Sequence, residues 1–130
     1  MKNLIKNTIL LFAILLSGTM MAQSTMSKKS EAKIVKLTQT PGAFEQESLE
    51  LKAGEKYIFE VKNQGVDHEV GFVVAPKGKT EQENHIKNAY VNETVKAGET
   101  QSSNEVVLEK GEYVFFCPMN PTPEYRLTVK

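Results

Sequence analysis

Residues 111–123 read GEYVFFCPMNPTP, a run of aromatic and β-branched residues that leads into a loop framed by prolines. The first part of this run, up to Cys117, predicts a short strand. Cys117 is the only cysteine of the chain, and Met119 follows two residues later. Because proline fixes φ and the loop holds three prolines, we expect a stiff loop that displays two sulfur atoms at the end of a strand.

Other short strands, separated by Gly or Pro turns, are predicted on the N-terminal side of this run and after it. The clearest is residues 56–63, where Tyr57, Phe59 and Val61 alternate with polar residues and share one face. Seven or eight strands are expected in all, at residues 32–38, 44–51, 56–63, 68–75, 93–96, 100–108, 113–117 and 125–130. A chain of this length can bury a core without disulfides. The pattern therefore predicts an all-β, antiparallel two-sheet sandwich.

Two segments of the predicted domain carry polar residues of interest. The strand at 68–75 places His68 at its start, on the face that also carries large apolar residues (Val70, Phe72 and Val74). Residues 80–90 are polar and predict either a short helix capped by Thr80, with Glu83 at the third position, or a long loop.

The first 22 residues have the parts of a secretory signal peptide. Lys2 and Lys6 precede an apolar run at residues 9–16, and cleavage is expected after Ala22. The apolar run is far shorter than the ~20 residues of a spanning helix, so no membrane span is expected after cleavage. Residues 23–31 predict a flexible leader, and residues 32–130 predict the folded domain, in a periplasmic or secreted protein.

Composition argues against several functions. The chain has 16 basic and 16 acidic residues and no basic stripe, so a nucleic-acid partner is not expected. Signatures of nucleophilic catalysis and Gly-rich phosphate loops are missing, so we do not expect an enzyme. With one cysteine, an internal disulfide is impossible. An unpaired thiol in an oxidising compartment indicates burial, a metal ion or an intermolecular bond.

Two stretches of the sequence resemble the cupredoxin family of small blue-copper proteins. Residues 59–70, FEVKNQGVDHEV, are similar to the turn and strand that carry a histidine ligand, and His68 matches that histidine. Residues 110–118, KGEYVFFCP, are similar to the strand that carries the thiolate ligand, and Cys117 matches it. The resemblance covers nearly all of the predicted domain. It implies a Greek-key β-sandwich, a copper cofactor, a monomer, and a redox or copper-transfer protein as partner.

The ligand set of the family is incomplete in this chain. A blue copper site combines two imidazoles and a thiolate with a weak axial sulfur. In the family the second histidine follows the cysteine by a few residues, but Asn120 and Thr122 stand there in this chain. The later position of the axial methionine holds Tyr125 and Arg126, and no histidine follows Cys117. A normal blue site is therefore not expected.

Three interpretations of the candidate site remain open. In the first, His68 and Cys117 bind copper with Met119, which favours Cu(I), or with Glu124, which favours a harder ion. In the second, the metal is lost, Cys117 is a buried apolar residue, and the chain is an interaction or structural module. In the third, His85 joins from the polar segment 80–90. We predict the first: an exported protein with an atypical copper site at His68, Cys117 and Met119, used for electron transfer or copper handling.

Overall fold

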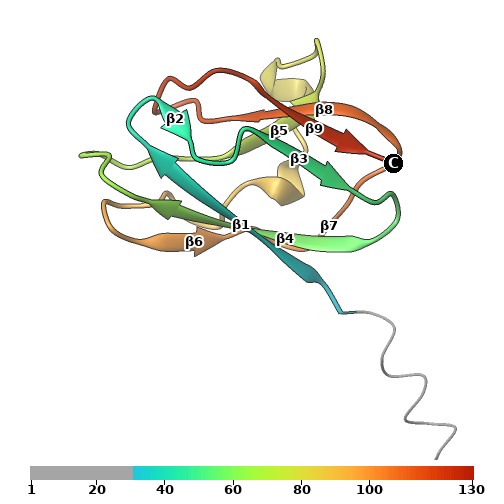
Figure 1. Cartoon of the computed structure of the whole chain (residues 1–130), viewed down its shortest axis with the longest axis horizontal. Coiled ribbons are helices and arrows are strands. Elements are labelled where there is room, and N and C mark those ends of the chain that lie inside the picture. Colours follow the sequence, from blue (N-terminus) through green and yellow to red (C-terminus); the bar gives the residue numbers. More distant parts are fainter. Residues whose placement is uncertain (1–30) are drawn as a thin grey trace, which may run out of the picture. The chain divides into compact units, whose positions relative to one another are not determined.

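Nine strands in two sheets form the framework of residues 31–130, the part of the chain that the computed structural model describes. One sheet has the order β2–β1–β4–β6, with β7 also paired to β4, and the other has the order β3–β9–β8–β5. Figure 1 shows the two sheets as stacked layers, which confirms the predicted β-sandwich. The elements are β1 (Lys33–Thr40), β2 (Ala43–Phe44), β3 (Ser48–Leu51), β4 (Lys56–Asn63), β5 (Val73–Pro76), the 3-10 turns η1 (Gln82–Asn84) and η2 (Lys87–Ala89), β6 (Thr100–Ser102), β7 (Val106–Val107), β8 (Gly111–Phe116) and β9 (Tyr125–Val129).

Two strand pairs depart from the predicted antiparallel arrangement. β1 lies parallel to β4, and β3 lies parallel to β9, whereas the other named pairs are antiparallel. Parallel neighbours need a crossover connection. Between β1 and β4 the chain crosses to the second sheet to form β3, so it returns to the first sheet in its original direction. The strand number exceeds the prediction because two predicted strands are each divided, residues 44–51 into β2 and β3 and residues 100–108 into β6 and β7, whereas residues 93–96 form no named strand.

The hydrophobic core lies between the two sheets. The predicted inward face of β4 is buried, with Phe59 and Val61 at 0% exposure and Tyr57 nearly so. On the other sheet, Phe115 of β8 is fully buried, and its ring meets the ring of Phe44 edge-on at 5.2 Å between centroids. Each such side chain contributes ~1.5–3 kcal/mol on burial. This core holds together the ends of strands from which the candidate site is built.

Residues 80–90 form the two 3-10 turns η1 and η2, in place of the short helix that was one of the two expectations. The capping position of η1 is held by Glu81 and not by the predicted Thr80. The Glu81 side chain makes no capping hydrogen bond. The segment is nevertheless attached to the sandwich. The backbone N–H of Ile86 donates to the Val74 carbonyl at 2.8 Å, which places the segment along the edge strand β5.

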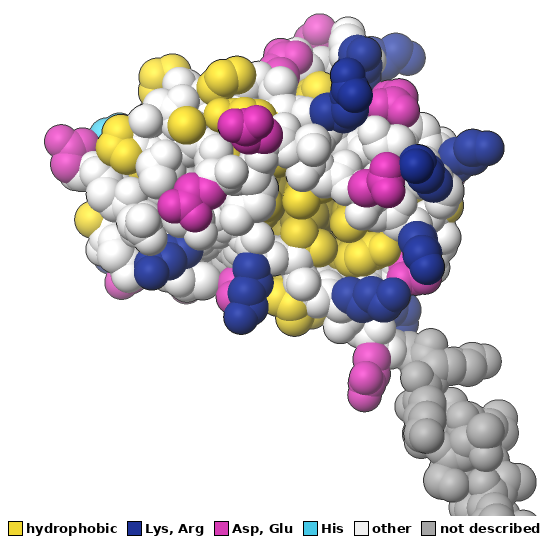
Figure 2. Space-filling model, viewed as in Figure 1, with side chains coloured by type: hydrophobic (Ala, Val, Ile, Leu, Met, Phe, Trp, Pro, Cys, Tyr) yellow, Lys and Arg dark blue, Asp and Glu magenta, His cyan; other side chains and the backbone are white. Residues whose placement is uncertain are grey.

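The predicted signal peptide, residues 1–22, and nearly all of the predicted leader, residues 23–31, lie outside the described residues. Within residues 31–130, no helix is long and apolar enough to cross a membrane. Figure 2 shows acidic and basic side chains intermixed over the face in view. This face therefore presents no continuous basic surface of the kind that neutralises a nucleic-acid backbone.

Candidate metal centre

The loop after β8 places the Cys117 sulfur beneath the surface and surrounds it with hydrogen-bond donors. Cys117 is buried, and its Sγ accepts from the backbone N–H groups of Gly71 at 3.3 Å, Met119 at 3.4 Å and Asn120 at 3.1 Å. Backbone N–H groups that converge on one atom form a concave site for negative charge. Such donors also orient a ligating sulfur and tune its chemistry. The loop is therefore built to hold an electron-rich sulfur in one position.

A pair of buried side-chain amides braces this loop; we call Gln39 and Asn120 the amide clamp. Asn120 Oδ1 accepts from the Gly42 N–H at 2.8 Å, and its Nδ2 donates to Gln39 Oε1 and to the Thr40 carbonyl, both at 2.9 Å. Gln39 Nε2 donates to the Gly71 carbonyl at 3.0 Å. The clamp thus ties the Cys117 loop to β1, to the turn after it, and to the residue whose N–H contacts the sulfur.

Sequence reasoning missed the role of the amide clamp. In the sequence, Asn120 stands where a histidine is expected, which gives no sign of a bracing role. Gln39 lies on the same inward face of β1 as the buried Leu37, two residues earlier. A polar residue on an inward strand face is a signal for a buried hydrogen-bond partner, because burial without one is costly.

Thr122, the other residue near the missing histidine position, also closes the loop. The backbone N–H of Cys117 donates to Thr122 Oγ1 at 3.0 Å. Asn120 and Thr122 therefore stand where a metal-binding histidine was expected, and their side chains make hydrogen bonds within the protein. Residues 113–123 carry no charged side chain, so the loop itself places no charge beside the sulfur.

Met119 lies at the surface of the same loop. Its side chain is 45% exposed, and its Sδ lies 3.6 Å from the position that a Cβ atom on Gly71 would occupy. The N–H of Gly71 is one of the donors to Cys117 Sγ. The two sulfur atoms therefore adjoin the same residue; the thiol is buried, and the thioether belongs to an exposed residue.

His68 does not share the apolar face on which the alternation placed it. Val70 is fully buried, but His68 is exposed, and β5 begins only at Val73. Val70 pairs instead with Val95 through an isolated bridge, so the chain is still bending at His68. His68 Nδ1 lies 2.9 Å from the Glu69 carbonyl, which can only accept, so Nδ1 carries the proton in the neutral ring. The lone pair of the neutral ring is then on Nε2, the nitrogen available to a metal ion.

The two alternative ligands have other partners. His85 Nε2 lies 2.9 Å from the Thr80 carbonyl and its Nδ1 lies 2.7 Å from the Tyr90 hydroxyl, so both ring nitrogens are hydrogen-bonded. Glu124 is exposed and lines a hollow with a different set of residues (Lys77, Tyr113, Val114 and Arg126). For either side chain to reach Cys117, these arrangements would have to be given up.

A blue copper ligand set does not fit the described residues. Residues 31–130 contain two histidines, His68 and His85. Both ring nitrogens of His85 are engaged in hydrogen bonds, so a second imidazole is not free to bind a copper ion together with His68. In the same part of the chain, no group of three or more His, Cys, Asp or Glu side chains lies close enough to hold a metal ion. A sulfur-based set is the donor set that the loop offers, with Cys117 and Met119 beside Gly71.

Comparison with known proteins identifies the family. A family model described as a cupredoxin-like domain matches residues 9–129, so this chain belongs to the cupredoxin-like family, as the sequence resemblance indicated. A search of curated proteins finds no match.

Solved structures share the fold at low sequence identity. Auracyanin B is 20% identical, with 79% of this chain and 92% of auracyanin B covered and a TM-score of 0.64. Auracyanin A, a "blue" copper protein from the green thermophilic photosynthetic bacterium Chloroflexus aurantiacus, is 14% identical, with 77% and 100% covered and a TM-score of 0.62. Reduced auracyanin from Roseiflexus castenholzii is 14% identical, with 78% and 98% covered and a TM-score of 0.60.

Proposed function

We propose that this chain is an exported copper-binding protein with an atypical, sulfur-based site that serves copper handling or electron transfer. The carrying observation is that the Cys117 sulfur, held by three backbone N–H donors, and the Met119 thioether adjoin the same residue, Gly71. Soft thiolate and thioether ligands select Cu(I). Auracyanin A, which has the same fold, is a blue copper protein, and this supports copper as the metal.

The residues proposed to hold the ion are Cys117, Met119 and His68. Cys117 would supply the thiolate, and its N–H donors would remain directed at the sulfur. Met119 would supply a thioether at the protein surface, where a partner protein can reach it. His68 would supply Nε2, the nitrogen left with the lone pair by the Nδ1 hydrogen bond. Bound copper would supply a one-electron couple, or a cargo for transfer to a redox or copper-transfer partner.

The proposal includes the setting of this protein. The N-terminal pattern of Lys2, Lys6 and an apolar run ending before Ala22 supports export to the periplasm or beyond. A monomeric carrier without enzymatic activity fits a small sandwich whose one sulfur-bearing loop is partly exposed.

A Cu(I) competition titration with a chromogenic chelator tests the proposed site. The wild-type protein is expected to take up one Cu(I), Cys117→Ser is expected to abolish uptake, and Met119→Leu and His68→Gln are each expected to weaken it at least about tenfold, equivalent to ~1.4 kcal/mol. Met26→Leu, in the predicted leader, and His85→Gln are the matched controls and should bind as the wild type does. Because a second imidazole is missing, Cu(II) should give no intense blue thiolate band.

The alternative function is a metal-free interaction or structural module, and the amide clamp favours it. The clamp and Thr122 close the Cys117 loop with hydrogen bonds alone. This alternative predicts that the wild-type protein takes up no Cu(I) and that Cys117→Ser changes only the free energy of unfolding. Such a result would overturn the copper proposal.

A further inference from the structure

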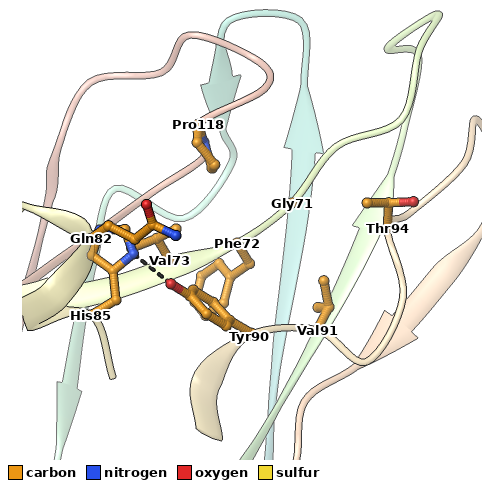
Figure 3. Close-up of a pocket in the computed structure, with 9 residues that line it drawn as sticks. All are labelled: Gly71, Phe72, Val73, Gln82, His85, Tyr90, Val91, Thr94 and Pro118. Atoms are coloured by element: carbon orange, nitrogen blue, oxygen red, sulfur yellow. Dashed lines mark hydrogen bonds between the residues drawn. The ribbon is translucent and has the colours of Figure 1, made fainter. Parts of the chain in front are cut away.

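An open pocket of about 450 Å³ lies beside the Cys117 loop, and none of the three proposed copper ligands lines it. Its walls come from three segments: the stretch that leads into β5, the segment that contains η1 and η2, and the loop after β8. Figure 3 shows these segments enclosing a common space. The lining residues are Gly71, Phe72, Val73, Gln82, His85, Tyr90, Val91, Thr94 and Pro118.

The walls of the pocket are uncharged and largely apolar. None of the nine lining residues is Asp, Glu, Lys or Arg. The lining combines the aliphatic side chains of Val73 and Val91 with the rings of His85 and Tyr90 (Figure 3). A charged group seated against these walls would exchange part of its hydration for no ionic partner, which is unfavourable. The occupant is therefore expected to be a neutral molecule with a large apolar surface.

The aromatic wall is already in place without a ligand. The His85 ring is held at both nitrogens, by the Thr80 carbonyl and the Tyr90 hydroxyl, and it meets the Phe116 ring edge-on at 6.0 Å. The hydrogen bond from Ile86 to β5 fixes the segment that carries this wall. Ligand binding would therefore cost little conformational entropy, because the aromatic wall is already ordered.

Polar groups lie on opposite sides of this apolar space. Figure 3 shows Gln82 on one side and Thr94 on the other. The Gln82 amide can donate and accept, while the Thr94 hydroxyl donates to Glu69 and keeps its oxygen as an acceptor. A hydroxyl group on a ligand would find a partner at either side, and a carbonyl group would find one at Gln82.

We propose that this pocket binds a neutral ring compound of about two fused rings that carries one hydroxyl or carbonyl group. A dry cavity of ~150 Å³ is known to hold one benzene ring, so the volume here suits a larger ring system. The ligand would also contact the Cys117 loop, because Pro118 follows the cysteine and Gly71 donates its N–H to the sulfur. This proposal does not depend on copper binding.

The probe is 2-naphthol, titrated into the ¹⁵N-labelled protein in a chelator-containing, copper-free buffer and followed by amide chemical shifts. Saturable shifts are expected at Gly71, Val73 and Val91. Naphthalene-2-sulfonate, which adds a negative charge to the same rings, should bind at least about tenfold more weakly. Shifts that do not saturate, or equal binding of the sulfonate, would overturn the proposal.

Variants locate the bound molecule. Val91→Phe fills the pocket and should weaken 2-naphthol binding at least about tenfold, whereas Val107→Phe, at a 55% exposed valine of β7 outside the pocket, should not. Gln82→Glu, at an exposed site remote from the core, replaces one of the two polar partners proposed for the hydroxyl by a carboxylate and should change the affinity for 2-naphthol, whether or not Val91→Phe folds. Unchanged affinity in Gln82→Glu, or an equal loss in Val107→Phe, would place the probe elsewhere and refute the pocket assignment.

Discussion

Replacing Asn120 with alanine should destabilise the protein strongly, because Asn120 is the buried centre of the amide clamp. The substitution removes three hydrogen bonds, with the Gly42 N–H, the Thr40 carbonyl and Gln39 Oε1. Gln39 is completely buried, so leaving its Oε1 without a hydrogen-bond donor costs ~1–3 kcal/mol. The hydrogen bonds with the Gly42 N–H and the Thr40 carbonyl are partly buried, and each contributes ~0.5–1.5 kcal/mol. The expected loss in the free energy of unfolding is about 2–6 kcal/mol in total.

This loss is measurable by equilibrium urea unfolding followed by circular dichroism, since the chain has no tryptophan. With a slope of ~2 kcal/mol per molar urea, the midpoint of Asn120→Ala should fall by roughly 1–3 M. Asn104→Ala, at an exposed asparagine outside the clamp, is the control and should change the free energy of unfolding by less than about 0.5 kcal/mol. A second readout is the reaction rate of the Cys117 thiol with a disulfide reagent, which should rise when the loop loses its brace.

The reasoning on the amide clamp is refuted if Asn120→Ala unfolds at the same urea concentration as the control. It is also refuted if the variant is destabilised while the Cys117 thiol stays as unreactive as in the wild type. The first result would mean that water replaces the lost partners, and the second that the clamp does not hold the loop.

Two further predictions concern the core and high pH. The ring centroid of Phe72 lies 5.1 Å from that of Phe59, and Phe72→Ala should lower the free energy of unfolding, measured in urea, by ~3–5 kcal/mol. Ile34→Ala, at a half-exposed site, should leave the free energy of unfolding nearly unchanged. Similar losses for both variants would contradict the assigned core. Burial raises the pKa of Tyr113, and the charge of Glu109 raises it further. As pH rises above about 10, Tyr113 therefore ionises first in the unfolded chain. The free energy of unfolding then falls until the folded Tyr113 ionises too. Tyr113→Phe should therefore lose less stability than the wild type between about pH 9 and pH 11 in urea unfolding, and parallel curves would count against this assignment.

Much of the fold could be predicted from local patterns. Alternation at Tyr57, Phe59 and Val61 identified the inward face of a central strand, because side chains in a strand alternate between the two faces. The aromatic run that ends at Cys117 placed the thiol at a strand end, and the order of these stretches indicated the cupredoxin family, which the family match confirms. The missing second histidine was likewise visible in the residues after Cys117.

The sequence by itself therefore determined the inward face of β4, the position of the cysteine and the family, since each can be read from short stretches of the chain. Only the tertiary structure showed that Asn120 bonds Gln39, 81 residues away, that Cys117 and Met119 both adjoin Gly71, and that His68 is exposed. Hydrogen-bond partners far apart in the chain leave no local periodicity, and a bend before β5 cancels the alternation that placed His68. The candidate site depends on these long-range contacts because its loop is held from the opposite side of the sandwich.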